Sequence, residues 1–167
     1  SGLRFFEQAH VKDLVAQLRF VVNPKDTTAF LRFACLLPKV GEKTAIKLLK
    51  LALTISEEKS SPLCTILGDE KLLNKVPKDA KEDWESMAET LVLIHEAAVN
   101  SAPSVVVEEA IGGWYQLYLR ATYENWPRRE EDLESLVDFA SKYENLEYNC
   151  CGTTCAIART HKKLFRG

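Results

Sequence analysis

The chain has 167 residues, of which 46% are hydrophobic and 28% charged, and its formal net charge is −2. That length suits one domain with a real core, and no apolar run approaches the roughly 20 residues of a membrane-spanning helix. The five cysteines are odd in number and two are adjacent, unlike a secreted disulfide framework. We therefore expect a cytoplasmic protein without a membrane partner.

Apolar residues recur at helical spacing through nearly the whole chain. In chain order, helices are predicted over residues 6–22, residues 27–37, a stretch after Gly41, and residues 79–100, 105–123 (bent at Gly112-Gly113) and 129–143. Asp26 is the expected N-cap of the second helix. Short helices and loops are expected over residues 54–78, and a loop at Asn125-Trp126-Pro127. Because no stretch alternates as a strand does, the predicted fold is an irregular all-α domain.

The segment Leu36–Ala45 has the pattern L-P-x-V-G-x-x-x-A, typical of the tight turn in a helix-hairpin-helix motif. Pro38 lacks a backbone N–H and disfavours helical dihedrals at the residue before it, so we expect it to stop the incoming helix. Gly41 is expected to adopt a backbone conformation that other residues resist. The next helix would begin with free N–H groups and the positive end of its dipole facing outward, which suits a phosphate.

The helix after this turn has a basic side. At about 100° per residue, its lysines fall opposite its apolar residues, and residues 32–50 hold five basic residues and one acidic residue, a local net charge of +4. Such a patch would bind the backbone of duplex DNA without reading bases. The predicted DNA-binding residues are Lys39, Val40, Gly41, Lys43, Thr44, Lys47 and Lys50. The alternative is an ordinary amphipathic helix with a solvated lysine side.

Six segments also carry a family resemblance: residues 2–7 (GLRFFE), 11–14 (VKDL), 18–19 (LR), 23–26 (NPKD), 32–44 and 129–136 (REEDLESL). Together they resemble the 2B subdomain of UvrD/PcrA/Rep-type superfamily 1 DNA helicases, over residues 2–147. In that family the segment similar to residues 32–44 ends in a GIG-type, helix-hairpin-helix-like contact to duplex DNA. Where the family usually has R-G-I-G, this chain has Lys39-Val40-Gly41 and lacks the first glycine.

The resemblance implies that residues 1–147 form a 2B-like helical domain, an accessory part of an ATP-dependent 3′-to-5′ helicase. Its partners would be double-stranded or forked DNA, the helicase motor domains, which use ATP and Mg²⁺, and regulatory proteins. The chain has no P-loop of its own, because Leu37 and Glu42 occupy the positions where G-x-x-x-x-G-K-[ST] needs glycine. We therefore expect no catalytic residue, no cofactor and no ATPase activity in this chain.

Residues 148–167 do not align with that family and are treated as a separate cysteine-containing, basic tail. Cys150, Cys151, Cys155 and His161 are zinc-ligand types, but their spacing fits no standard zinc motif, so no metal site is predicted. Two other functions stay open. One is a helical protein-interaction or regulatory module. The other is a helix-hairpin-helix DNA glycosylase, for which Asp69 is the nearest catalytic candidate, although its flanking sequence does not match.

Overall fold

A computed structural model describes the backbone of residues 2–147 and the side chains of residues 4–142. Within that range the chain forms ten α-helices and one 3-10 helix, and no strand, which confirms the all-α fold class. The elements are α1 (Gly2–Glu7), α2 (Ala9–Val22), α3 (Thr27–Ala34), α4 (Glu42–Lys59), α5 (Leu63–Ile66), α6 (Glu70–Leu73), η1 (Lys78–Ala80), α7 (Lys81–Asn100), α8 (Pro103–Gly112), α9 (Trp114–Thr122) and α10 (Trp126–Glu147).

The separate tail at residues 148–167, with its four possible zinc ligands, lies outside the described residues. Within the described part of the chain, no helix combines the length and the apolar composition that crossing a bilayer requires.

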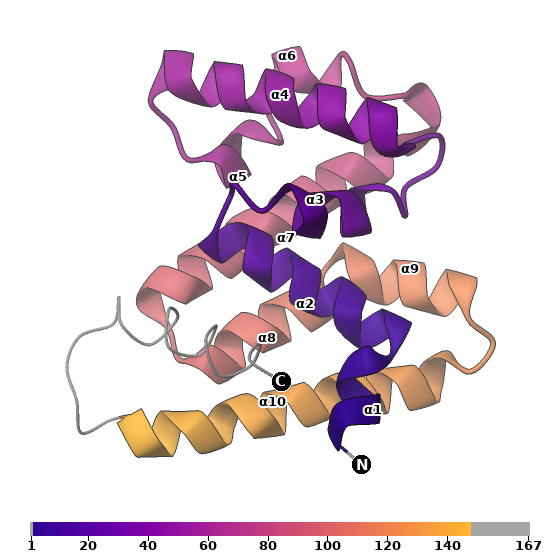
Figure 1. Cartoon of the computed structure of the whole chain (residues 1–167), viewed down its shortest axis with the longest axis vertical. Coiled ribbons are helices and arrows are strands. Elements are labelled where there is room, and N and C mark those ends of the chain that lie inside the picture. The colour runs from indigo at the N-terminus through magenta and orange to yellow at the C-terminus, as the bar shows by residue number, and fades with distance from the viewer. Residues whose placement is uncertain (1, 148–167) are drawn as a thin grey trace.

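Helices α2 and α7 cross the middle of the molecule, with α4 and α6 on one side of them and α8 and α10 on the other (Figure 1). The most extensive contacts join α8 to α10, α7 to α8 and α2 to α3. The apolar stripe predicted for the long helix is buried along α7 and comprises Trp84, Met87, Ala88, Leu91, Ile94 and Ala98. Aromatic rings join α7 to α3, with the ring centroids of Phe30 and Trp84 6.1 Å apart.

Some predicted helix boundaries are wrong. The expected loop at Asn125-Trp126-Pro127 is instead the start of α10, because a proline in the first turn of a helix loses no intrahelical hydrogen bond. Helix α4 continues to Lys59, since the chain holds no helix breaker before Ser60, whose left-handed backbone (φ 49°) ends the helix. The helix expected over residues 6–22 is interrupted at Gln8, which has an extended backbone.

Three polar side chains of α2, those of His10, Asp13 and Gln17, are buried. The Asp13 carboxylate accepts hydrogen bonds from the Tyr115 hydroxyl at 2.7 Å and from Arg32 Nε at 2.9 Å. Burial raises the pKa of Asp13, and these two donors oppose that rise by stabilising the carboxylate. The network ties α2 to α3 and α9 through contacts that a purely apolar stripe would not make.

His10, on α2, contacts two charged side chains of α10. Because arginine can only donate, the 2.8 Å contact of Arg129 Nη1 with Nδ1 makes Nδ1 the acceptor. The neutral ring then carries its proton on Nε2, which donates to Asp132 Oδ2 at 2.9 Å. Desolvation is the largest influence on the pKa of His10 and lowers it, so the folded protein favours the neutral ring.

Candidate nucleic-acid interface

The connection between α3 and α4, residues 35–41, is here called the hairpin turn. The chain reverses direction across it, so that α4 runs back past α3 (Figure 1). Asp26 caps the start of α3 as predicted, since its Oδ1 accepts a hydrogen bond from the Ala29 N–H at 3.0 Å. Helix α3 ends at Ala34, four residues before the proline expected to stop it.

After the last α-helical turn of α3, two hydrogen bonds of the tighter i to i−3 type follow. They join the Leu36 N–H to the Phe33 carbonyl at 3.1 Å and the Leu37 N–H to the Ala34 carbonyl at 3.2 Å. The chain therefore leaves the α-helical path before it reaches Pro38, although Pro38 still prevents a return to it.

The residue with the unusual backbone in this turn is Lys39, not Gly41. Lys39 has a φ of 60°, in the left-handed region, and the Val40 N–H bonds the Leu37 carbonyl at 3.2 Å across it. A proline followed by a left-handed residue is the pattern of a type II β-turn. Gly41 instead has φ −88° and ψ 177°, ordinary extended backbone that any residue can adopt. The conformational role predicted for Gly41 is therefore wrong.

Gly41 is the N-cap residue of α4, and no side chain caps this end of the helix. The Ala45 N–H bonds the Gly41 carbonyl at 2.9 Å and closes the first helical turn. The N–H groups of Glu42, Lys43 and Thr44 precede that bond, and such groups have no carbonyl partner within their own helix. The glycine also leaves space, because a Cβ added at Gly41 would meet nothing within 4 Å.

The side chains of Lys39, Lys43, Lys47 and Lys50 are all exposed, and together they are called the lysine face. The opposite side of α4 is buried as predicted, through Ala45, Leu48, Leu49 and Ala52. Lys43, Lys47 and Lys50 share the exposed side of α4 by their helical spacing, and Lys39 lies in the hairpin turn just before the helix begins.

Val40 and Thr44, two other residues of the predicted DNA-binding set, are less exposed than the lysines. Val40 is only 4% exposed, so its side chain anchors the hairpin turn in the core and does not belong to the lysine face. Thr44 is half-buried at the edge of α4. Any part that Val40 plays in binding would have to come from its backbone.

Arg32, one of the five basic residues of the segment 32–50, is not part of the lysine face. Its Nε donates to Asp13 Oδ1 at 2.9 Å, and its Nη2 donates to the Ala9 carbonyl at 3.4 Å. Both hydrogen bonds of this guanidinium are therefore made to α2. The positive charge beside the turn is consequently that of four lysines against one acid, Glu42, a net charge of +3.

Three of the five charged residues in the end turns of α4 are placed against the helix dipole. Lys43 lies in the first turn, whereas Glu57 and Glu58 are exposed in the last turn. A helix is stabilised by the opposite order, acids at its N-terminus and bases at its C-terminus, and only Glu42 and Lys59 follow it. The stability of α4 therefore does not explain the lysines, and they leave its N-terminal end positive.

Asp69, the nearest catalytic candidate of a glycosylase, makes structural contacts. It is the N-cap of α6, where its Oδ1 accepts from the Lys71 N–H at 3.0 Å, and its other oxygen is ion-paired with Lys59. The hydrogen bond from Lys59 is the largest influence on the pKa of Asp69 and lowers it. Among the described residues there is also no group of three or more potential metal ligands.

A scan of the sequence against protein-family models finds no match, and neither does a search of curated proteins.

Proposed function

We propose that this chain is a duplex-DNA-contacting accessory domain, of the 2B type found in UvrD-like helicases, and that the lysine face is its contact surface. One observation carries the proposal. The N-terminus of α4 has no side-chain cap, and four exposed lysines lie in the turn before it and along the helix after it. Backbone N–H groups and lysine ammonium groups are both donors that phosphate oxygens accept.

The proposed contact is independent of DNA sequence. Lysine side chains are flexible point charges, and the lysine face has no asparagine, glutamine or arginine that could pair with a base edge in two places at once. Binding would place the start of α4 against one strand and spread the lysines along neighbouring phosphates. With at most four phosphates neutralised, the logarithm of the association constant would fall with the logarithm of salt concentration with a slope of about −3.6.

In this proposal the chain binds and positions DNA and performs no chemistry itself. ATP and Mg²⁺ would be bound by the motor domains of a parent helicase, and the 3′-to-5′ unwinding would be theirs. The contribution of this domain would be to hold the duplex ahead of the motor.

The experiment that tests this is a binding titration with a labelled forked duplex at low ionic strength. The Lys43→Glu/Lys47→Glu variant should lose binding, because it replaces two attractive charges by repulsive ones beside the helix start. The Lys12→Glu/Lys142→Glu variant is the matched control, since it carries the same net charge and alters exposed lysines on α2 and α10.

Equal affinity of these two variants would refute the lysine face as the contact. Circular dichroism should show that both variants keep the helical content of the wild type, so that a loss of binding is not a loss of fold.

A further inference from the structure

A cavity of about 440 Å³ borders the hairpin turn on the side of α7 and α9. Its lining comes from residues 36–38 of the turn, from the first residues of α7 and from one side of α9. That volume lies within the roughly 300–1,000 Å³ typical of sites that bind ligands. The cavity is separate from the lysine face, although Pro38 at its edge immediately precedes Lys39.

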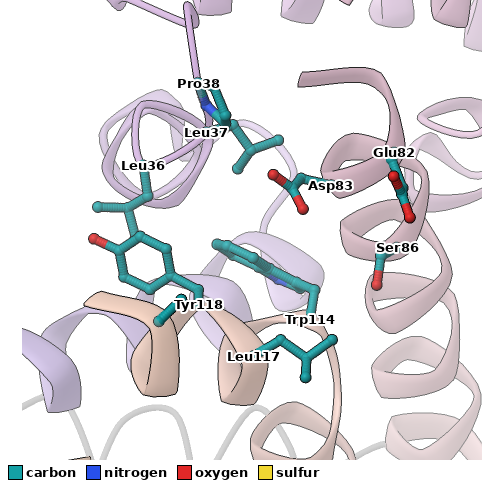
Figure 2. A pocket seen from close by; sticks show the side chains of 10 residues that line it. Leu36, Leu37, Pro38, Glu82, Asp83, Ser86, Trp114, Leu117 and Tyr118 are labelled. Carbon is teal, nitrogen blue, oxygen red and sulfur yellow. The ribbon is translucent and has the colours of Figure 1, made fainter. Parts of the chain in front are cut away.

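The α9 wall of the cavity is aromatic and aliphatic. Figure 2 shows the rings of Trp114 and Tyr118 beside the cavity, opposite Leu37. Leu117, at 68%, has the greatest exposure of any large hydrophobic side chain in the described part of the chain. Ala121, one helical turn further, is also exposed and extends this apolar surface along α9. An apolar surface that continues out of the cavity suits a segment of another protein better than a small enclosed ligand.

The α7 wall is acidic. Glu82 and Asp83 are exposed, and Figure 2 shows the Asp83 carboxylate directed into the cavity. Among the side chains that the structure describes, those of residues 4–142, neither carboxylate takes part in an ion pair. Two negative charges without an ion-pair partner repel phosphate and attract a cation, so the charge of this wall favours a basic partner over DNA.

We propose that this cavity docks a peptide segment of a partner protein in which an aliphatic or aromatic side chain lies next to a lysine or arginine. The apolar side chain enters between Leu37 and the rings of Trp114 and Tyr118. The neighbouring cation pairs with Asp83 or Glu82 at the acidic wall. Burying one large apolar side chain in such a pocket is the usual anchor of a peptide contact. The proposal does not depend on DNA binding by the lysine face.

The test begins with random dodecapeptides displayed on phage, selected on the wild-type chain and counter-selected on the Leu117→Glu variant. The selected peptides should carry a large apolar residue within one helical turn of a lysine or arginine. A synthetic peptide of the selected sequence, labelled with a fluorophore, is then titrated against purified variants. Leu117→Glu and Asp83→Lys should each weaken its binding about tenfold or more, because one removes the apolar rim and the other reverses the charge.

The matched control is Leu93→Glu, which places the same charge at another exposed leucine, 46% exposed on α7 and outside the cavity lining. It should bind the peptide as the wild type does. Asp83→Lys reverses an exposed charge in the first turn of α7 and leaves the apolar lining of the cavity in place. It therefore provides a second test if Leu117→Glu reduces the helical content, and circular dichroism should show that its own helical content is kept.

Three results would overturn the proposal. One is the selection of peptides without a basic residue, and another is equal binding of the peptide by Asp83→Lys and the wild type. The third is a wild-type dimer in sedimentation that Leu117→Glu converts to a monomer, since this surface would then be a contact between two copies of the chain.

Discussion

Replacing Gly113 by alanine should destabilise the fold strongly, although the neighbouring Gly112 should accept the same change. Gly113 joins α8 to α9, and a Cβ placed there would lie 2.3 Å from Thr90 Cγ2 and 2.4 Å from Thr90 Oγ1. Thr90 is buried on α7, and its hydroxyl accepts the Trp114 N–H at 3.1 Å. A Cβ added at Gly112 would meet nothing within 4 Å.

The size of the effect follows from these contacts. Overpacking a buried site costs about 1–3 kcal/mol, and turning Thr90 away to relieve it would give up a hydrogen bond worth about 1 kcal/mol. Gly113→Ala should therefore lower the free energy of unfolding by about 2–4 kcal/mol, a fall in Tm on the order of 10 °C for a chain of this length. Gly112→Ala, at the last residue of α8, should be neutral or stabilising by up to about 1 kcal/mol.

Urea unfolding of both variants, followed by circular dichroism, measures this difference. A double variant of Gly113→Ala with Thr90→Ala, which removes the two closest atoms, should be less destabilised than the sum of the two single variants. Equal stability of Gly113→Ala and Gly112→Ala would refute the close packing of this bend on α7.

Three further predictions concern single residues. The folded-state pKa of His10 is below its ordinary value of 6.5, so the unfolded state takes up the proton first. The contribution of His10 to stability should therefore be constant above about pH 6.5 and fall below it. Glutamine can also donate and accept a hydrogen bond but does not titrate, so His10→Gln should reduce the loss of stability between about pH 7.5 and pH 5.5, measured by urea titration at each pH. An unchanged loss of stability in this variant would show that other groups cause the pH dependence. In the hairpin turn, Lys39→Gly should leave stability unchanged or raise it by up to about 1 kcal/mol, because it removes a left-handed non-glycine residue. Gly41→Ala should cost less than about 1 kcal/mol, and a larger loss in thermal unfolding would show that the glycine is required after all.

Local patterns were sufficient to predict the helices that bury a regular stripe. The periodicity of α7 and α4 identified their buried sides, and the N-cap at Asp26 follows from the properties of one side chain. The exposure of Lys43, Lys47 and Lys50 was predictable for the same reason, since the exposed side of an amphipathic helix is fixed once its buried side is known.

The features that the sequence did not reveal depend on residues far apart in the chain. His10 and Arg129 are 119 positions apart, and Arg32 is removed from the basic surface by Asp13 on another helix. No periodicity predicts such pairs, because it describes one helix at a time. The cavity was missed for a similar reason, as its walls come from a turn and two helices that meet only in the folded chain.

The proposed DNA contact is tested most directly by recording the backbone amide resonances of the labelled chain by NMR while a forked duplex is added at low ionic strength. The account predicts progressive shifts of the amides at residues 39–44, 47 and 50, which reverse when salt is raised. Shifts confined to other helices such as α10, or no shift at any duplex concentration, would contradict it.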